Sequence, residues 1–170
     1  MARLQLTHRR TRAPSRRVGY PGSTNMARIL VADDDHLLRW SLKQSLTQEG
    51  HLVRAVGSGL AAVEATEEDE FRVAIVQYES QEDGKPGGPQ VLRKIKTHAP
   101  ATHVIAISAE SAPRIERQAR DLGAFDFLEK PFHLVTLRQA VERAIATPER
   151  RRGPRGCCPG CEWQAPCTAL

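Results

Sequence analysis

Between residues 26 and 147, short apolar runs alternate with longer amphipathic stretches. The apolar runs do not alternate between apolar and polar residues as a half-exposed strand does. Such continuous runs are typical of strands that are covered on both faces. They are "RILVA" (28–32), "HLVRAV" (51–56), "FRVAIV" (71–76), "HVIAIS" (103–108) and "FDFL" (125–128). We therefore predict five buried strands in this part of the chain.

Each run is followed by a stretch that predicts a helix. Leu38, Leu42 and Leu46 recur at helical spacing behind the first run, and Gly50 supplies a stop. Asp35 and Ser58 are residue types that cap helix starts, so we expect them to be the N-caps of the first and second helices. The remaining expectations are a second helix that ends near Glu68, a third through "PQVLRKIK" (89–96), a fourth that starts at Ser111 and Pro113 and ends at Gly123, and a fifth with an apolar face of Leu137, Val141, Ala144 and Ile145.

The alternation of five strands with five helices indicates the fold class. It predicts an α/β domain with a parallel five-stranded sheet, helices on both faces and right-handed crossovers. In such doubly wound sheets, ligands bind outside the carboxyl ends of the strands. Residues at that edge are therefore the first candidates for function.

Charge divides the chain into three parts. Residues 1–25 hold six arginines and no acid, residues 26–147 hold 15 Lys or Arg against 18 Asp or Glu, and residues 148–170 hold four arginines against two glutamates. The central part is thus mildly acidic, and the basicity belongs to the ends. We interpret residues 1–25 as a disordered basic extension or an upstream mis-start, because the strand signal begins right after Met26. The arginine runs could hold nucleic acid weakly, but no element that reads bases accompanies them.

The cysteines and the hydropathy bear on the compartment. No stretch approaches the roughly 18 consecutive apolar residues of a membrane span. All four cysteines lie in the Arg/Gly/Pro/Cys-rich tail 148–170, so the core has no disulfide, which is typical of a reducing cytoplasm. They are Cys157, Cys158, Cys161 and Cys167. Their spacing leaves two interpretations open, a small metal knuckle or a disordered tail.

Polar residues of complementary chemistry follow the predicted strands. Carboxylates come after the first strand, an amide after the third, a hydroxyl at the end of the fourth, and a lysine after the fifth. Carboxylates suit Mg²⁺, whereas a hydroxyl and an ammonium suit phosphoryl oxygens, so the pattern predicts a phosphate site. The residues are Asp33, Asp34 and Asp35, Gln77, Ser108, and Lys130 with Pro131.

Several of these stretches resemble a known family. "ILVADDD", "AISAES" and "FDFLEKPF" are similar to the hallmark stretches of bacterial response-regulator receiver domains, and "DDDHLLRWSLKQSL" resembles those of nitrogen-regulator type. The resemblance covers about residues 26–147. It implies a flavodoxin-like (βα)5 fold, CheY-like in the family's terms, and a role in phosphorelay signalling through two-component systems.

The resemblance also implies roles for individual residues. Asp33 and Asp34 take the places of the acidic pair, with Asp34 the direct Mg²⁺ ligand. Ser108 and Lys130 take the places of the residues that contact the phosphoryl group. Pro131 stands where a cis peptide bond is expected, and Phe127 stands either as the switch aromatic or as a packed strand-end residue.

Gln77 is the main departure from the family, because it stands where the family carries the aspartate that is phosphorylated. An amide is a poor nucleophile, so the usual reaction should be absent. Loss of an anionic ligand should also weaken Mg²⁺ binding. Gln77 could instead form a hydrogen bond with Lys130 or Asp34 and fix one conformation.

The loop that follows, residues 78–90, is about three residues longer than is usual for the family and lacks its Met-Pro turn. A neighbouring carboxylate from this region is the alternative phosphoacceptor. The candidates are Glu79, Glu82 and Asp83.

We expect a receiver-like domain that acts alone, without enzymatic activity, as a phosphorylation-independent protein-binding module. The resemblance implies a histidine kinase or another signalling protein as partner, bound by the face of the fourth helix, fifth strand and fifth helix. Two rival functions are a genuine phosphoacceptor and a DNA- or metal-binding adaptor that acts through its tails. The residues expected on the partner face are Arg114, Arg117, Arg120, Phe127 and Leu137.

Overall fold

The computed structural model describes residues 26–79, 86–110 and 112–148. Strands and helices alternate strictly along this part of the chain, as the sequence predicts. In order they are β1 (Arg28–Ala32), α1 (His36–Gln48), β2 (Leu52–Val56), α2 (Gly59–Glu68), β3 (Val73–Gln77), α3 (Gly88–His98), β4 (His103–Ser108), α4 (Pro113–Asp121), β5 (Asp126–Glu129) and α5 (Leu134–Ala146). The basic extension, the cysteine tail, Ser111 and residues 80–85 lie outside the described residues.

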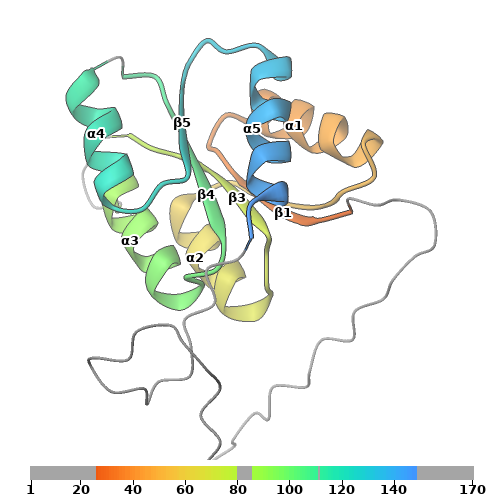
Figure 1. Cartoon of the computed structure of the whole chain (residues 1–170), viewed down its shortest axis with the longest axis horizontal. Helices are drawn as coiled ribbons and strands as arrows, with labels where there is room; N and C mark the ends of the chain where they lie inside the picture. Colours follow the sequence, from red (N-terminus) through yellow and green to blue (C-terminus); the bar gives the residue numbers. More distant parts are fainter. Residues whose placement is uncertain (1–25, 80–85, 111, 149–170) are drawn as a thin grey trace, which may run out of the picture.

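The five strands form one parallel sheet in the order β2-β1-β3-β4-β5. This is the flavodoxin-like order, and it confirms the predicted fold class. β1 and β3 are neighbours although β2 lies between them in sequence, and Figure 1 shows them side by side near the centre of the sheet. Because all five strands run in the same direction, their carboxyl ends share one edge.

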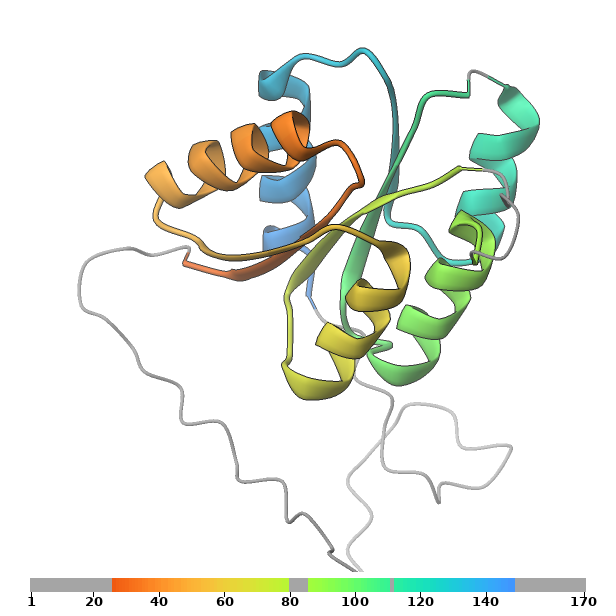
Figure 2. The same ribbon diagram turned by 180° about the vertical axis from the view of Figure 1, so that it is seen from behind.

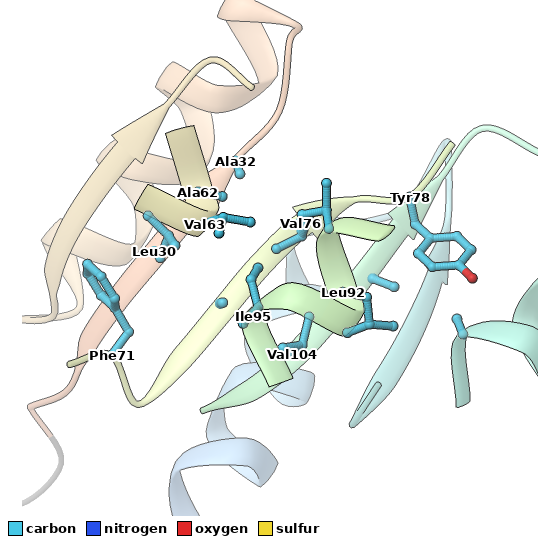
Figure 3. Packing of buried hydrophobic residues seen from close by; sticks show 14 of the residues in the cluster. Leu30, Ala32, Ala62, Val63, Phe71, Val76, Tyr78, Leu92, Ile95 and Val104 are labelled. Atoms are coloured by element: carbon cyan, nitrogen blue, oxygen red, sulfur yellow. The ribbon is translucent and has the colours of Figure 1, made fainter. Parts of the chain in front are cut away.

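Two layers of helices cover the sheet. Helices α1 and α5 lie on one face, and α2, α3 and α4 lie on the other, as Figures 1 and 2 show from opposite sides. The sheet separates two hydrophobic cores, and successive side chains of β1 point into them alternately. Ile29 packs in the core beneath α1 and α5, and Leu30 packs in the core beneath α2, α3 and α4. Figure 3 shows the second of these clusters, with Leu92 and Ile95 of α3 against the sheet.

Burial differs between the central and edge strands. β1, β3 and β4 are almost entirely buried, as their apolar runs predict. β2 lies at the edge of the sheet and is partly exposed throughout, with Leu52 53% exposed. The prediction of a strand covered on both faces is therefore wrong for β2, because only β1 pairs with it.

Both predicted N-caps are confirmed, and the fourth helix begins at Pro113 as predicted. The Asp35 carboxylate accepts hydrogen bonds from the backbone N–H groups of Leu37 and Leu38, and the Ser58 hydroxyl accepts one from that of Ala61. α4 has Ala112 as its N-cap, with no side-chain hydrogen bond. Gly50 and Gly123 have φ of 89° and 94°, which explains glycine at both helix ends.

None of the helices in the described ranges is long and apolar enough to cross a membrane.

Candidate functional site

The sheet brings the predicted polar residues to one edge. Gln77 is the last residue of β3 and pairs in register with Ile107, and Ser108 is the last residue of β4. Asp33 directly follows β1, and Lys130 directly follows β5. Four residues that are up to 97 positions apart in sequence thus surround the same strand ends.

An ion pair joins the two outer members of this group. The Lys130 ammonium donates to Asp33 Oδ2 at 2.8 Å, and the other oxygen of the carboxylate accepts the backbone N–H of Asp35 at 2.9 Å. The Asp33 residue is only 2% exposed. Both oxygens of a buried carboxylate are thereby satisfied within the protein, as a buried charge requires.

The backbone holds Lys130 in this position. Its N–H donates to the carbonyl of Ser108 at 2.7 Å, which extends the β4–β5 pairing by one step. The Lys130–Pro131 peptide bond is cis, the isomer that the resemblance implies.

Gln77 turns its amide toward the end of β1. Its Oε1 accepts the backbone N–H of Asp34 at 2.9 Å. Of the two hydrogen bonds foreseen from the sequence, the structure contains the one with Asp34, through the backbone rather than the carboxylate, while Lys130 bonds to Asp33 instead. The amide oxygen therefore links the end of β3 to the segment that directly follows β1.

Ser108 is fully buried, and its hydroxyl accepts the backbone N–H of Glu110 at 3.0 Å. On the other side of the site, the Arg39 guanidinium donates to the carbonyl oxygens of Asp33 and Asp34 at 2.6 and 3.4 Å. Arg39, which was not predicted as a site residue, thus ties α1 to the end of β1. Arg39 lies six residues beyond Asp33, on the first turn of α1, from where its long side chain can reach back to the end of β1. This position is the sequence feature that could have indicated its contact.

The donor set fits a magnesium ion poorly. The part of the chain that the structure describes contains no group of three or more His, Cys, Asp or Glu side chains that could hold a metal. The Asp33 carboxylate is paired with Lys130, and the Gln77 oxygen accepts the N–H of Asp34. Of the acidic pair Asp33 and Asp34, only the exposed carboxylate of Asp34 is not engaged in these bonds. We therefore derive no step through a metal.

An aromatic pair closes the site on the α2/α3/α4 side. Tyr78 and Phe127 meet edge to face, with ring centroids 6.3 Å apart. Tyr78 is 2% exposed, and burial raises the pKa of its phenol. It packs so closely on the start of α3 that a Cβ at Gly88 would lie 2.6 Å from the Tyr78 Cα. Phe127 is half-buried against the same core, which describes its packing but leaves its switch role a prediction.

Tyr78 is a residue of the site that was not predicted from the sequence. Tyr78 directly follows Gln77, and because successive side chains of a strand point to opposite faces, its ring points into the core shown in Figure 3. This alternation is the sequence feature that could have indicated it.

The predicted partner face is only partly accessible. Leu137 is 1% exposed and packs against the sheet, so its assignment to that face is wrong; its side chain belongs to the buried apolar stripe of α5. Arg120 is engaged in ion pairs with Glu116 at 2.9 Å and Asp126 at 3.4 Å. Arg114 and Arg117 are exposed.

The remaining predicted residues fall partly outside the described residues. Glu79 is described, and its backbone carbonyl accepts the N–H of Gly88 at 2.8 Å. The other candidate carboxylates and the tail cysteines lie outside: Glu82, Asp83, Cys157, Cys158, Cys161 and Cys167.

Comparison with known proteins identifies the family. The family model of the response regulator receiver domain matches residues 29–142. The chain belongs to this family, and it is a receiver domain of two-component signalling.

Its relatives include regulators of several bacteria. The chain is 33% identical over 119 residues to the DNA-binding transcriptional regulator NtrC of Azospirillum brasilense, which covers 70% of this chain and 24% of that protein. It is 31% identical over 121 residues to the transcriptional regulatory protein PdtaR of Mycobacterium tuberculosis, covering 70% and 57%. The chain thus spans about a quarter of the length of NtrC.

Solved structures agree with the fold. NtrX from Brucella abortus is 31% identical with a TM-score of 0.65, over 71% of this chain and 27% of that one. A CheY-like receiver domain protein from Methanospirillum hungatei gives the same TM-score at 22% identity, over 71% and 94%, and shows the fold alone.

Proposed function

We propose that this receiver domain acts as a phosphorylation-independent protein-binding module and catalyses no phosphoryl transfer. The observation that carries the proposal is the hydrogen bond from the Asp34 N–H to Gln77 Oε1. It places an amide at the end of β3, where the resemblance locates the phosphoacceptor aspartate.

The chemistry of the amide supports this. Attack on phosphorus needs an available lone pair with negative charge, and the amide nitrogen has its lone pair delocalised into the carbonyl. The amide oxygen is neutral and already accepts a hydrogen bond, so Gln77 offers no nucleophile.

The surrounding groups are satisfied without a phosphoryl group. Lys130, which would neutralise phosphoryl oxygens, neutralises Asp33 instead, and the Ser108 hydroxyl accepts a backbone N–H. A phosphoryl group would compete with Asp33 for the Lys130 ammonium, so the ion pair disfavours its binding.

Glu79 is poorly suited to replace the missing nucleophile. It lies two residues beyond Gln77, with the buried Tyr78 ring between them along the chain, and its own carbonyl ties the chain to Gly88. A displacement of about 1 Å can already cost a catalytic group about 100-fold in rate, so rescue from this position is disfavoured.

Family membership supports a signalling protein as partner, because receiver domains interact with kinases and other signalling proteins. We propose a histidine kinase or another signalling protein as the partner of this chain. Binding would then depend on the surface of the domain rather than on the chemistry of the strand ends.

The proposal is tested by recording backbone amide NMR spectra of ¹⁵N-labelled protein before and after adding Mg²⁺ and acetyl phosphate. We expect the wild-type spectrum to stay unchanged, while Gln77→Asp shifts the amides around Ser108 and Lys130. Phosphodonor-dependent shifts of the same amides in the wild type would contradict the proposal.

A further inference from the structure

The arginines of the described residues divide into two groups. Seven of the ten donate from the guanidinium to a carboxylate or a backbone carbonyl: Arg28, Arg39, Arg54, Arg72, Arg120, Arg138 and Arg143. Within the ranges that the structure describes, the guanidinium groups of Arg93, Arg114 and Arg117 have no such partner, and all three side chains are exposed. Three arginines of the described residues are therefore left without an ion-pair or hydrogen-bond partner for their guanidinium groups.

These three arginines lie together. They line one groove of about 660 Å³ between α3 and α4, with Gln118, Asp121 and Leu122 as its other walls. Figures 1 and 2 both show α3 and α4 side by side on the outer face of the domain. Arg93 comes from α3, whereas Arg114 and Arg117 are one turn apart on α4, so cations face the groove from both sides.

We propose that this groove is the docking site for an acidic segment of a partner protein. The inference rests on the proposed function, because it names the surface through which the domain binds without phosphorylation. It also moves the expected contact from the face of α4, β5 and α5 to the groove between α3 and α4, since Arg120 is already paired and Leu137 is buried.

Charge and shape favour a peptide over other anions. An arginine fork matches a carboxylate with two parallel hydrogen bonds, and three forks spread over two helices suit several carboxylates along an extended segment better than one compact phosphate. Leu122 and the arginine stems add apolar surface that a peptide can cover.

The test is a fluorescence anisotropy titration of a fluorescein-labelled deca-glutamate peptide with the full chain, at low ionic strength and without Mg²⁺ or phosphodonor. Arg114→Glu/Arg117→Glu is compared with wild type. Lys94→Glu, which reverses one charge, is the control for a change outside the groove, because Lys94 is exposed on α3 but does not line the groove. The basic ends are the same in every variant, so differences report on the described domain.

We expect the double variant to weaken peptide binding about tenfold or more, and Lys94→Glu to change it less than about twofold. Absence of binding by the wild type, or equal weakening by the two variants, would overturn the proposal. Titrations with ATP and with a single-stranded DNA decamer complete the test. If either binds the wild type more tightly than the peptide and loses that binding in the double variant, the assignment to an acidic protein segment is wrong.

The readout is separate from that of the proposed function. A phosphoryl group found on the wild-type protein would refute the proposed function without changing the peptide titration. A failed titration would refute the docking role of the groove and leave the proposed absence of phosphoryl transfer untouched.

Discussion

Removing the Lys130 ammonium should destabilise the domain, because it leaves a buried carboxylate without its counter-charge. In Lys130→Met the side chain keeps its length, but Asp33 Oδ2 loses the donor that lies at 2.8 Å, and only the Asp35 N–H remains on the other oxygen. Stranding one partner of a buried ion pair costs about 3–5 kcal/mol. The side chain of Lys130 is 20% exposed, so water reaches this end of the pair, and we expect about 2–3 kcal/mol.

A double-mutant cycle isolates the pair. Asp33→Asn removes the buried charge, and combining it with Lys130→Met removes both charges. The double variant should be more stable than the sum of the single effects predicts, by about 1–3 kcal/mol. Urea unfolding at neutral pH measures this, since a loss of 2 kcal/mol moves the midpoint by about 1–2 M in a domain of this size. Single effects that add within about 0.5 kcal/mol would refute the coupling.

Three further predictions concern the site, the core and acid stability. Gln77→Asp adds a third carboxylate to the site and should lower the unfolding free energy by about 1 kcal/mol without Mg²⁺. Adding Mg²⁺ should restore this stability, and the wild type should respond far less to the ion. Thermal unfolding with and without Mg²⁺ measures both effects. Gly59→Ala puts a Cβ 2.5 Å from Val91 Cγ2 and should cost about 1–3 kcal/mol in urea unfolding, with Gly59→Ala/Val91→Ala costing less than the two single changes together. Burial lowers the pKa of His51, whose Nδ1 accepts the N–H of Ala27, so the unfolded chain binds the proton more readily. The stability that neutral His51 contributes to the folded domain is therefore fully present above the unfolded pKa of 6.5, and it is lost as the pH falls from there through the folded pKa. In urea unfolding at several pH values, His51→Gln should flatten the dependence of the unfolding free energy on pH. An unchanged slope of this dependence would contradict the assignment to His51.

The fold could be predicted from the sequence because its signals are local. The apolar runs of β1, β3 and β4 and the caps Asp35 and Ser58 each depend on a few neighbouring residues. β2 differs because the exposure of Leu52 depends on which strands flank it, and that is decided by the strand order rather than by the run itself.

The identity of the site residues could also be predicted, but their pairing could not. Parallel strands explain why Asp33, Gln77, Ser108 and Lys130 meet at one edge. Whether Lys130 binds Asp33 or Gln77 depends on side-chain geometry across the ends of four strands, β1, β3, β4 and β5, and no sequence spacing reports that geometry.

Surface contacts were the least predictable feature. Leu137 fits both a buried stripe and an exposed one until the helix rotation is known. The groove of Arg93, Arg114 and Arg117 depends on how α3 and α4 pack and on which other arginines find partners within the fold.

The most direct test of the central claim is the intact mass of the protein after incubation with acetyl phosphate and Mg²⁺, for the wild type beside Gln77→Asp. We predict that only Gln77→Asp gains a phosphoryl group, because the substitution supplies the carboxylate nucleophile, and a further anionic oxygen for Mg²⁺, at the strand ends where Asp33, Ser108 and Lys130 also lie. A phosphoryl group on the wild type, mapped by peptide analysis to Glu79, Glu82 or Asp83, would contradict the account and make the chain a genuine phosphoacceptor.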